Sequence, residues 1–105
     1  MRQNFFQATL NLVKKIPVGQ VSTYKIMATA LGRPLAARAV GRALNKNPEL
    51  IATPCHRVIK SNGEVGGYKK GKLMKKSLLK QEGIEFFGER VKDLDQYLFK
   101  FNLKK

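Results

Sequence analysis

The sequence has one cysteine, one histidine and only seven acidic residues among its 105. A single cysteine cannot form an internal disulfide, so the fold does not depend on oxidation. One cysteine and one histidine fall short of the ligand set of a structural zinc, and we expect no metal and no cofactor. No apolar run approaches the roughly 18 residues of a membrane span, and the first residues do not read as a signal peptide. We therefore expect an intracellular, cytoplasmic protein.

Basic residues are as abundant as acidic ones are scarce. The 21 lysines and arginines give a formal net charge of +14. A field of that sign attracts polyanions and speeds their encounter with the protein. Nucleic acid is the leading predicted partner; a membrane surface is disfavoured, because no basic helix has a broad apolar face to insert. At this length we expect one domain over residues 1–105.

Helical periodicity and boundary signals predict three helices in the first half of the chain, over residues 5–16, 22–31 and 35–45. Asn4 and Ser22 are the expected N-caps. Gly32 and Pro34 mark a tight turn between the second and third helices. The predicted buried stripe of the second helix consists of Ile26, Ala30 and Leu31.

The second and third helices are typical of a helix-turn-helix, because both are short and a glycine-containing turn joins them. Arg38 and Arg42 lie one turn apart in the third helix and are predicted to reach into DNA. Small residues around them allow close approach to a partner backbone: Ala36, Ala37 and Gly41. The alternative is that the two arginines form an ordinary solvated face.

The second half of the chain predicts a β-hairpin and two more helices. Asn62-Gly63 is a hairpin-turn signal between the apolar residues 58–59 and Val65. A helix over 72–82 is expected to end at Gly83 and to bury Leu73, Met74, Leu78 and Leu79. Apolar spacing predicts a terminal helix over about 92–102. The expected fold class is therefore mostly α with a small β-hairpin, similar to a winged helix-turn-helix domain.

The stretch Pro54-Cys55-His56-Arg57-Val58 places the only cysteine beside the only histidine. A free thiol has a pKa near 8.5, and nearby cations and a hydrogen-bonded base raise its thiolate fraction. Cys55 is therefore a candidate nucleophile with His56 as its base. The alternatives are an inert small hydrophobe at Cys55 and a structural histidine at position 56.

Three further positions have a functional and an ordinary interpretation. Glu82 is a candidate partner for His56, although it could be a solvated carboxylate at the helix end, where acids are disfavoured. Tyr24 could contact a phosphate or a base, or merely edge the core. The basic run 69–76 could track phosphates or simply be solvated.

These residues together resemble a known family, the O6-alkylguanine-DNA alkyltransferases (methylated-DNA–protein-cysteine methyltransferases), in their C-terminal catalytic domain. The resemblance covers about residues 3–85. The matching stretches are 16–24, 36–41, 47–48, 51–59, 61–63, 65–68 and 78–83.

The resemblance implies direct repair of duplex DNA that contains O6-alkylguanine. The protein would bind in the minor groove and flip the damaged base out of the stack. Cys55 would then take the alkyl group in a single-turnover reaction, with His56 accepting the thiol proton through a water and Glu82 orienting His56.

The resemblance also implies roles around this centre. Arg38 would fill the gap in the duplex, and Asn47 would tie the recognition helix to the active-site strand. Tyr24 would contact the base, and the backbone near Cys55 and Val58 would read its edge. The remaining expected pocket residues are Tyr68 and Lys69, the latter standing where many members have a small residue.

Two other functions compete with this prediction. One is an alkyltransferase-like sensor that flips damaged bases and recruits other repair factors; such relatives lack the cysteine, which favours the enzyme here. The other is a small basic RNA-binding or architectural protein. We expect a monomer associated with the nucleoid. Members usually carry an N-terminal domain, and we expect the final helix to cover surface that such a domain would bury.

Overall fold

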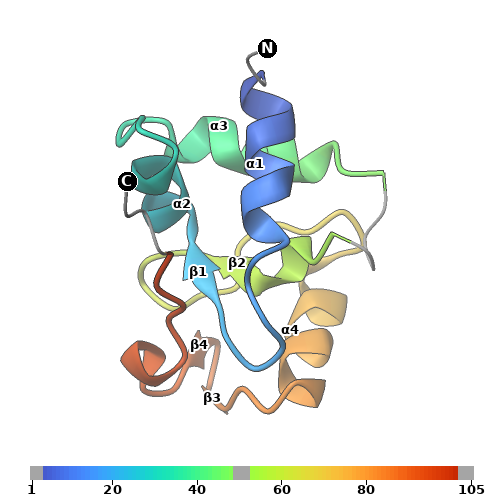
Figure 1. The fold of residues 1–105 in the computed structure, drawn as a ribbon. Helices are drawn as coiled ribbons and strands as arrows, with labels where there is room; N and C mark the ends of the chain where they lie inside the picture. The colour runs from blue at the N-terminus through green and yellow to red at the C-terminus, as the bar shows by residue number, and fades with distance from the viewer. Residues whose placement is uncertain (1–3, 49–52, 102–105) are drawn as a thin grey trace.

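The computed structural model describes residues 4–48 and 53–101 of the chain. Four α-helices dominate it, and its strands are only two residues long (Figure 1). The predicted mostly helical fold with a small β component is confirmed. No helix of the described residues is long and apolar enough to cross a bilayer. The apolar run predicted at 50–52 lies outside the described residues.

Helices α1 (Phe5–Val13), α2 (Tyr24–Ala30) and α3 (Ala37–Asn45) form one end of the molecule (Figure 1). Asn4 caps α1 as predicted, accepting a hydrogen bond from the Gln7 amide at 2.7 Å. The predicted cap of α2 is wrong by one residue. Thr23, not Ser22, accepts the Ile26 amide at 3.0 Å, because α2 begins at Tyr24 and Thr23 is the residue directly before it.

These helices differ from the prediction in three further respects, which are the end of α1, the start of α3 and the buried face of α2. Helix α1 ends three residues early, since Lys15 and Ile16 turn back through i→i−3 hydrogen bonds before Pro17. Helix α3 begins at Ala37 rather than Leu35, after a turn closed by the Ala36 amide on the Arg33 carbonyl at 2.9 Å. The predicted buried stripe of α2 is wrong, because Ile26, Ala30 and Leu31 are only half-buried and the buried residues of this helix are Met27 and Ala28.

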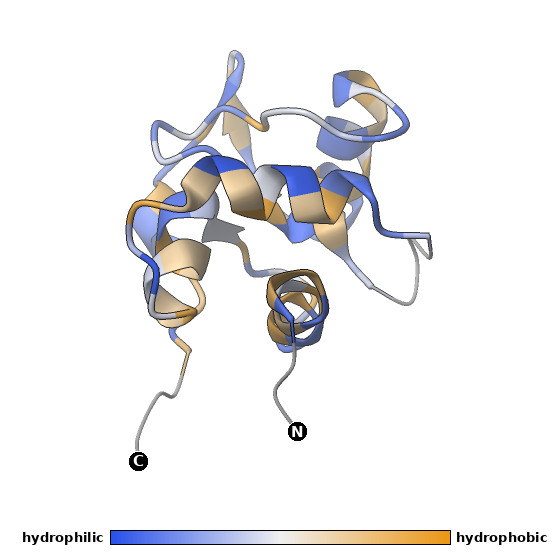
Figure 2. Cartoon of the chain, turned by 90° about the horizontal axis from the view of Figure 1, so that it is seen from above, coloured by the Kyte–Doolittle hydropathy of each residue, from blue (hydrophilic) through white to orange (hydrophobic). Residues whose placement is uncertain are grey.

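Two hydrophobic clusters lie on opposite sides of a parallel strand pair. Strand β1 (Ser22–Thr23) pairs with β2 (Val58–Ile59), Ser22 opposite Val58. Neighbouring residues of a strand face opposite ways, so Val58 joins the cluster beneath α1, α2 and α3 while Ile59 joins the other. Figure 2 shows hydrophobic and hydrophilic residues alternating along α3, whose Val40 and Leu44 are buried as predicted.

The predicted hairpin over 58–65 is wrong in its pairing but right in its turn. Gly63 has φ +94° and donates to the Lys60 carbonyl, so the Asn62-Gly63 turn forms. However, β2 pairs with β1 instead of with Val65. The antiparallel hairpin lies further on, between β3 (Phe86–Phe87) and β4 (Arg90–Val91).

The last two helix predictions have opposite outcomes. Helix α4 (Lys72–Gln81) is present and ends at Gly83, at φ +94°. Its predicted inward residues Leu73 and Met74 are exposed, and Leu79 is buried. The terminal helix is absent from the described part of residues 92–102, which has one short 3₁₀ turn, Leu94–Gln96, and then an extended segment whose Leu98 bridges Val21.

Candidate active site

The Cys55–Arg57 segment is a single 3₁₀ turn between Pro54 and β2. The Arg57 amide donates to the Pro54 carbonyl at 3.0 Å, and the Cys55 amide donates to the Thr53 carbonyl at 2.8 Å. Pairing of β2 with β1 then anchors the turn to the centre of the fold. Consecutive side chains of the turn therefore reach different partners.

The Cys55 sulfur is buried and held from two sides. The Asn47 amide nitrogen Nδ2 donates to Sγ at 2.8 Å, and the thiol faces the Leu44 carbonyl oxygen at 3.5 Å. Burial raises the pKa of the thiol, and the Asn47 hydrogen bond and the Lys75 and Lys69 ammonium groups act against that increase. The net pKa of Cys55 is raised, so the resting group is a thiol, and the amide and the two ammonium groups only partly offset the cost of ionising it.

Asn47 connects the recognition helix to this turn. It follows α3, is 1% exposed, and its Nδ2 also donates to the Thr53 carbonyl at 3.0 Å. Asn47 thus lies between the end of α3 and the Cys55 sulfur, where it was expected to tie the two together.

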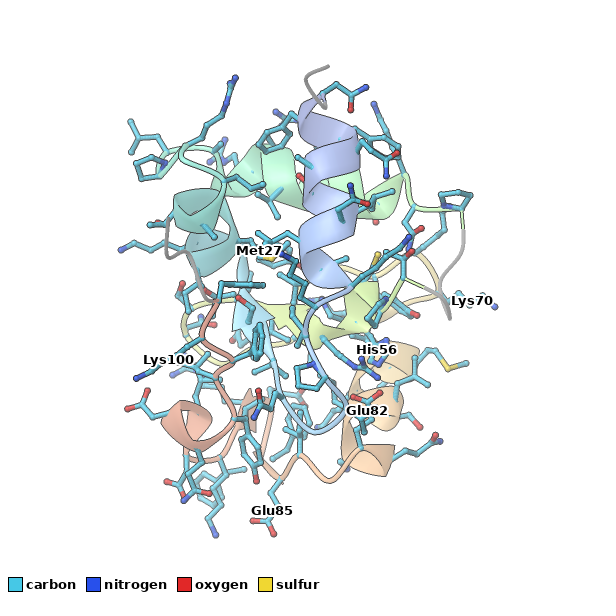
Figure 3. The ribbon with its side chains drawn as sticks, viewed as in Figure 1. Met27, His56, Lys70, Glu82, Glu85 and Lys100 are labelled. Atoms are coloured by element: carbon cyan, nitrogen blue, oxygen red, sulfur yellow. The ribbon has the colours of Figure 1, made fainter. Side chains whose placement is uncertain are left out.

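His56 and Glu82 lie side by side between the turn and the end of α4 (Figure 3). His56 Nε2 and Glu82 Oε2 are 2.8 Å apart. An ionised carboxylate only accepts, so Nε2 carries the hydrogen and Nδ1 is left as the acceptor. Nδ1 is buried and has no hydrogen-bond partner among the described residues. Burial lowers the pKa of His56 despite the carboxylate, so the imidazole is neutral and able to accept a proton.

Glu82 is positioned by the way α4 ends. The Gly83 and Ile84 amides bond back to the Lys80 and Leu79 carbonyls, which fixes Glu82 at the C-cap. Arg57 then grips both carboxylate oxygens, through Nε at 3.0 Å and an Nη at 2.9 Å. Burial raises the pKa of Glu82, but the hydrogen bonds and charges of Arg57 and His56 outweigh it, and the net pKa is lowered.

A small cavity of about 10 Å³ opens beside the sulfur. Three predicted residues line it together with Cys55, namely Tyr24, Tyr68 and Lys69. Val58 does not line it, because its side chain packs in the core. The other lining residues were not predicted as pocket residues: Gly41, Leu44, Asn45 and Gly67.

Lys75 is the functional candidate that sequence reasoning missed. It is 1% exposed, and its ammonium group donates to the Tyr24 hydroxyl at 3.1 Å and to the Gly67 carbonyl at 3.0 Å. Burial lowers its pKa to about 7. The i, i+4, i+7 spacing of Lys75, Leu79 and Glu82 on one helix face was the available signal. This spacing is easily overlooked because Lys75 lies in the basic run 69–76, which the sequence predicts to be solvated or to contact phosphates.

The predicted DNA-contacting residues separate into two groups. Arg38 and Arg42 are both exposed on α3. Arg42 lines a different hollow, of about 390 Å³, with Phe5 and Phe6 of α1. Gly41 instead adjoins the site, since an added Cβ would come within 3.8 Å of the Tyr24 ring. Ala36 caps α3, and Ala37 is its first residue.

Residues 4–84 match the family model described as 6-O-methylguanine DNA methyltransferase, DNA binding domain. The chain belongs to the 6-O-methylguanine DNA methyltransferase family. Methylated-DNA–protein-cysteine methyltransferases of Methanosarcina acetivorans and Saccharolobus solfataricus are 48% and 53% identical to it over 79 and 73 residues. These alignments cover 75% and 70% of this chain but 51% and 46% of the relatives. The chain therefore spans about half the length of the curated relatives it matches.

Two solved structures of 6-O-methylguanine DNA methyltransferase-like proteins are similar along the fold. Schizosaccharomyces pombe Atl1, in complex with damaged DNA containing O6-carboxymethylguanine, has a TM-score of 0.83 at 34% identity; the alignment covers 95% of this chain and 99% of that one. Mycobacterium tuberculosis OGT, in complex with DNA, has a TM-score of 0.74 at 40% identity over 78% of this chain and 51% of that one.

Proposed function

We propose that this chain is a catalytic alkyltransferase domain that removes the alkyl group from O6-alkylguanine in double-stranded DNA and keeps it on Cys55. The observation that carries the proposal is the buried sulfur beside a cavity, hydrogen-bonded by Asn47 and followed in sequence by the His56–Glu82 pair. A purely structural cysteine would not require that the next residue in the sequence be a neutral imidazole with a free acceptor nitrogen.

The chemical step is a displacement at the alkyl carbon. The thiol proton passes through a water to Nδ1 of His56, and Glu82 stabilises the resulting imidazolium. The Sγ–C bond forms as the C–O6 bond breaks, and guanine leaves as an anion. The Tyr24 hydroxyl lines the cavity and can protonate the leaving base, with Lys75 replacing that proton through its hydrogen bond to the Tyr24 oxygen. The thioether is not reopened, so each molecule reacts once.

DNA binding falls to α3 and the surrounding positive charge. Arg38 and Arg42 are exposed on this helix, and the whole chain carries a formal charge of +14. We propose that α3 enters the minor groove and that Arg38 fills the position of the flipped base. Contacts between the lysines and arginines and the DNA phosphates supply most of the affinity of such an interface, so binding will weaken steeply as the salt concentration rises.

The cavity must open to admit a base. Its volume of about 10 Å³ has room for at most about one water molecule and none for a purine base. Entry therefore requires the loop that carries Tyr68 and Lys69 to move away from α3. Gly66 supports this loop at φ +75°, where an added Cβ would lie 3.0 Å from the Tyr24 hydroxyl.

Peptide mass spectrometry tests the proposal directly. The protein is incubated with duplex DNA containing O6-methylguanine and digested, and the Cys55 peptide is weighed. We expect a gain of one methyl group in stoichiometric amount. Cys55→Ser should abolish the gain and retain DNA binding, because phosphate contacts rather than the thiol carry the affinity. An unmodified Cys55 peptide, together with tight binding of the damaged duplex, would refute transfer.

The second candidate is a damage sensor that binds alkylated DNA without transfer. The similarity to Atl1 over nearly the full length of both chains is the observation in its favour. The position of Cys55 against Asn47 and beside His56 favours transfer instead. The same mass measurement decides between the two functions.

A further inference from the structure

Lys69 is exposed, and its side chain lines the cavity that holds Cys55. It projects from the loop before α4 and donates from Nζ to the Asn47 backbone carbonyl at 3.0 Å. The side chain thus connects the loop to the residue that holds the sulfur. A base in the cavity would lie beside this contact.

The contact that holds Lys69 is weak for a cation. Its acceptor is a neutral carbonyl, whereas a carboxylate acceptor forms a shorter hydrogen bond of roughly twice the strength. None of the described residues that line the cavity carries a carboxylate. The nearby Lys75 ammonium is buried and already donates to Tyr24 and Gly67. Lys69 is therefore the cation at this site that can exchange its partner for an arriving anion.

We propose that Lys69 is a specificity-determining residue that selects O6-substituents ending in a carboxylate, such as carboxymethyl, over neutral O6-alkyl groups. This inference rests on the proposed function, because the damaged base has to occupy the cavity beside Cys55. The carboxylate takes the place of the Asn47 carbonyl as the acceptor of Nζ. The hydrogen bond to Asn47 is therefore lost as the hydrogen bond to the substituent forms. In the transfer step the Sγ–CH₂ bond forms, the CH₂–O6 bond breaks and Cys55 becomes S-carboxymethylcysteine.

Lys70 provides the matched control. It is the next residue, carries the same charge and is exposed like Lys69, but its side chain points away from the site at the edge of the molecule (Figure 3). Removing either charge weakens general attraction to DNA by a similar amount. Only removal of Lys69 should change the preference between substituents.

The experiment compares two isosteric lesions in one duplex sequence, O6-carboxymethylguanine and its neutral amide analogue O6-(2-amino-2-oxoethyl)guanine. Dissociation constants are measured in the Cys55→Ser background, which cannot transfer, for otherwise unaltered protein and for Lys69→Gln and Lys70→Gln. We expect the carboxylate lesion to bind about tenfold more tightly than the amide. Lys69→Gln should bring the ratio to near one, and Lys70→Gln should leave it unchanged.

Three results would overturn the role of Lys69: no preference in the parent protein, a preference that survives Lys69→Gln, or an equal loss in both lysine variants. Failure of the proposed function looks different. With Cys55 intact, an unmodified Cys55 peptide would end the transfer proposal, while a Lys69-dependent binding ratio would still uphold the selectivity.

Discussion

The two sides of the Cys55–Arg57 turn differ in charge. On one side the sulfur meets the neutral Asn47 amide, and the charged groups that act on it are the ammonium groups of Lys75 and Lys69. On the other side His56 and Arg57 converge on the carboxylate of Glu82. One turn thus separates cations that act against the raised pKa of the Cys55 thiol from a carboxylate that acts against the lowered pKa of the His56 imidazole, while burial sets the net direction of both shifts.

This separation explains how a proton can leave the thiol in a protein with few acids. If Glu82 lay on the sulfur side, it would raise the pKa of Cys55 and oppose the thiolate. The charges of Arg57 and Lys75 already lower the pKa of His56, and the Glu82 carboxylate is the group that acts against them. The polarity across the turn, rather than the Cys-His dipeptide alone, is what fits the pair for proton transfer.

We expect the largest effect from removing the carboxylate of Glu82. Glu82→Gln keeps the size of the side chain but leaves Arg57 and His56 without their carboxylate. The side chains of Arg57 and Glu82 are 13% and 15% exposed, so we expect a loss of about 2 to 3 kcal/mol in unfolding free energy at pH 7. Alkyl transfer should slow as well, because His56 is no longer oriented. Urea denaturation and single-turnover kinetics measure the two effects.

The pH dependence follows from the lowered pKa of Glu82. Its stabilisation is complete above the pKa of an unfolded carboxyl group and is lost as the pH falls through the lower folded pKa. Glu82→Gln should lose this part of the acid dependence. Glu85→Gln is the control, since Glu85 is exposed and points outward at the edge of the molecule (Figure 3). Equal losses in the two variants would mean that the Glu82 cluster does not stabilise the fold.

Removing the amide perturbs the sulfur side alone. Asn47→Ala deletes the donor to Cys55 Sγ and to the Thr53 carbonyl, so we expect a loss of about 1 to 2 kcal/mol. The pKa of Cys55 should rise further, and alkylation of the thiol by iodoacetamide at pH 8 should slow. Asn11→Ala, in α1, where the side chain accepts a hydrogen bond from Gln7 Nε2, should change neither quantity by a comparable amount. The comparison fails if Asn47→Ala shifts the pKa of His56 as much as that of Cys55.

Local signals in the sequence predicted the local features of the structure. The Asn4 cap, the Gly83 stop and the Asn62-Gly63 turn each depend on residues within a few positions. The pairing of Ser22 with Val58 does not, and strands of two residues have no alternation to read. β2 therefore pairs with a distant segment rather than with Val65, although the turn before Val65 still forms.

The predictions of a C-terminal helix and of a solvated or phosphate-contacting Lys75 were wrong for another reason. The apolar spacing of Leu94, Leu98 and Phe101 fits a helix, but an extended chain lets the Phe99 amide reach the Val21 carbonyl at 2.8 Å. Phe99 and Phe101 then pack on the helical cluster. A tertiary partner decided the conformation in this segment. At Lys75 a tertiary partner, the Tyr24 hydroxyl, decided the burial of a charge.

Lys75 gives the next prediction, a stability that rises with pH in a neutral window. Its native pKa of about 7 lies below the 10.5 of an unfolded lysine. Between these values the unfolded chain binds a proton that the native state lacks, so stability increases with pH, by at most about 1.4 kcal/mol per unit. Urea midpoints from pH 7 to 8.5 should show this rise, and Lys75→Met should abolish it. Lys72→Met, on an exposed position of the same helix, should retain the rise; a flat profile in the unaltered protein would contradict the lowered pKa of native Lys75.

We expect the smallest effect from a substitution of Ser22, which tests whether an unpartnered buried polar atom marks a chemical role. Among the described residues, the two buried side-chain polar atoms without a hydrogen-bond partner are Ser22 Oγ and His56 Nδ1. If only His56 Nδ1 has a chemical task, Ser22→Ala should leave alkyl transfer unchanged and alter stability by no more than about 0.5 kcal/mol, because it removes an unsatisfied hydroxyl. The neighbouring Thr23→Ala should cost about 1 kcal/mol, since Thr23 caps α2. A larger loss for Ser22→Ala than for Thr23→Ala would show that the hydroxyl stabilises the fold, and an unpartnered buried atom would then not distinguish the base from the scaffold.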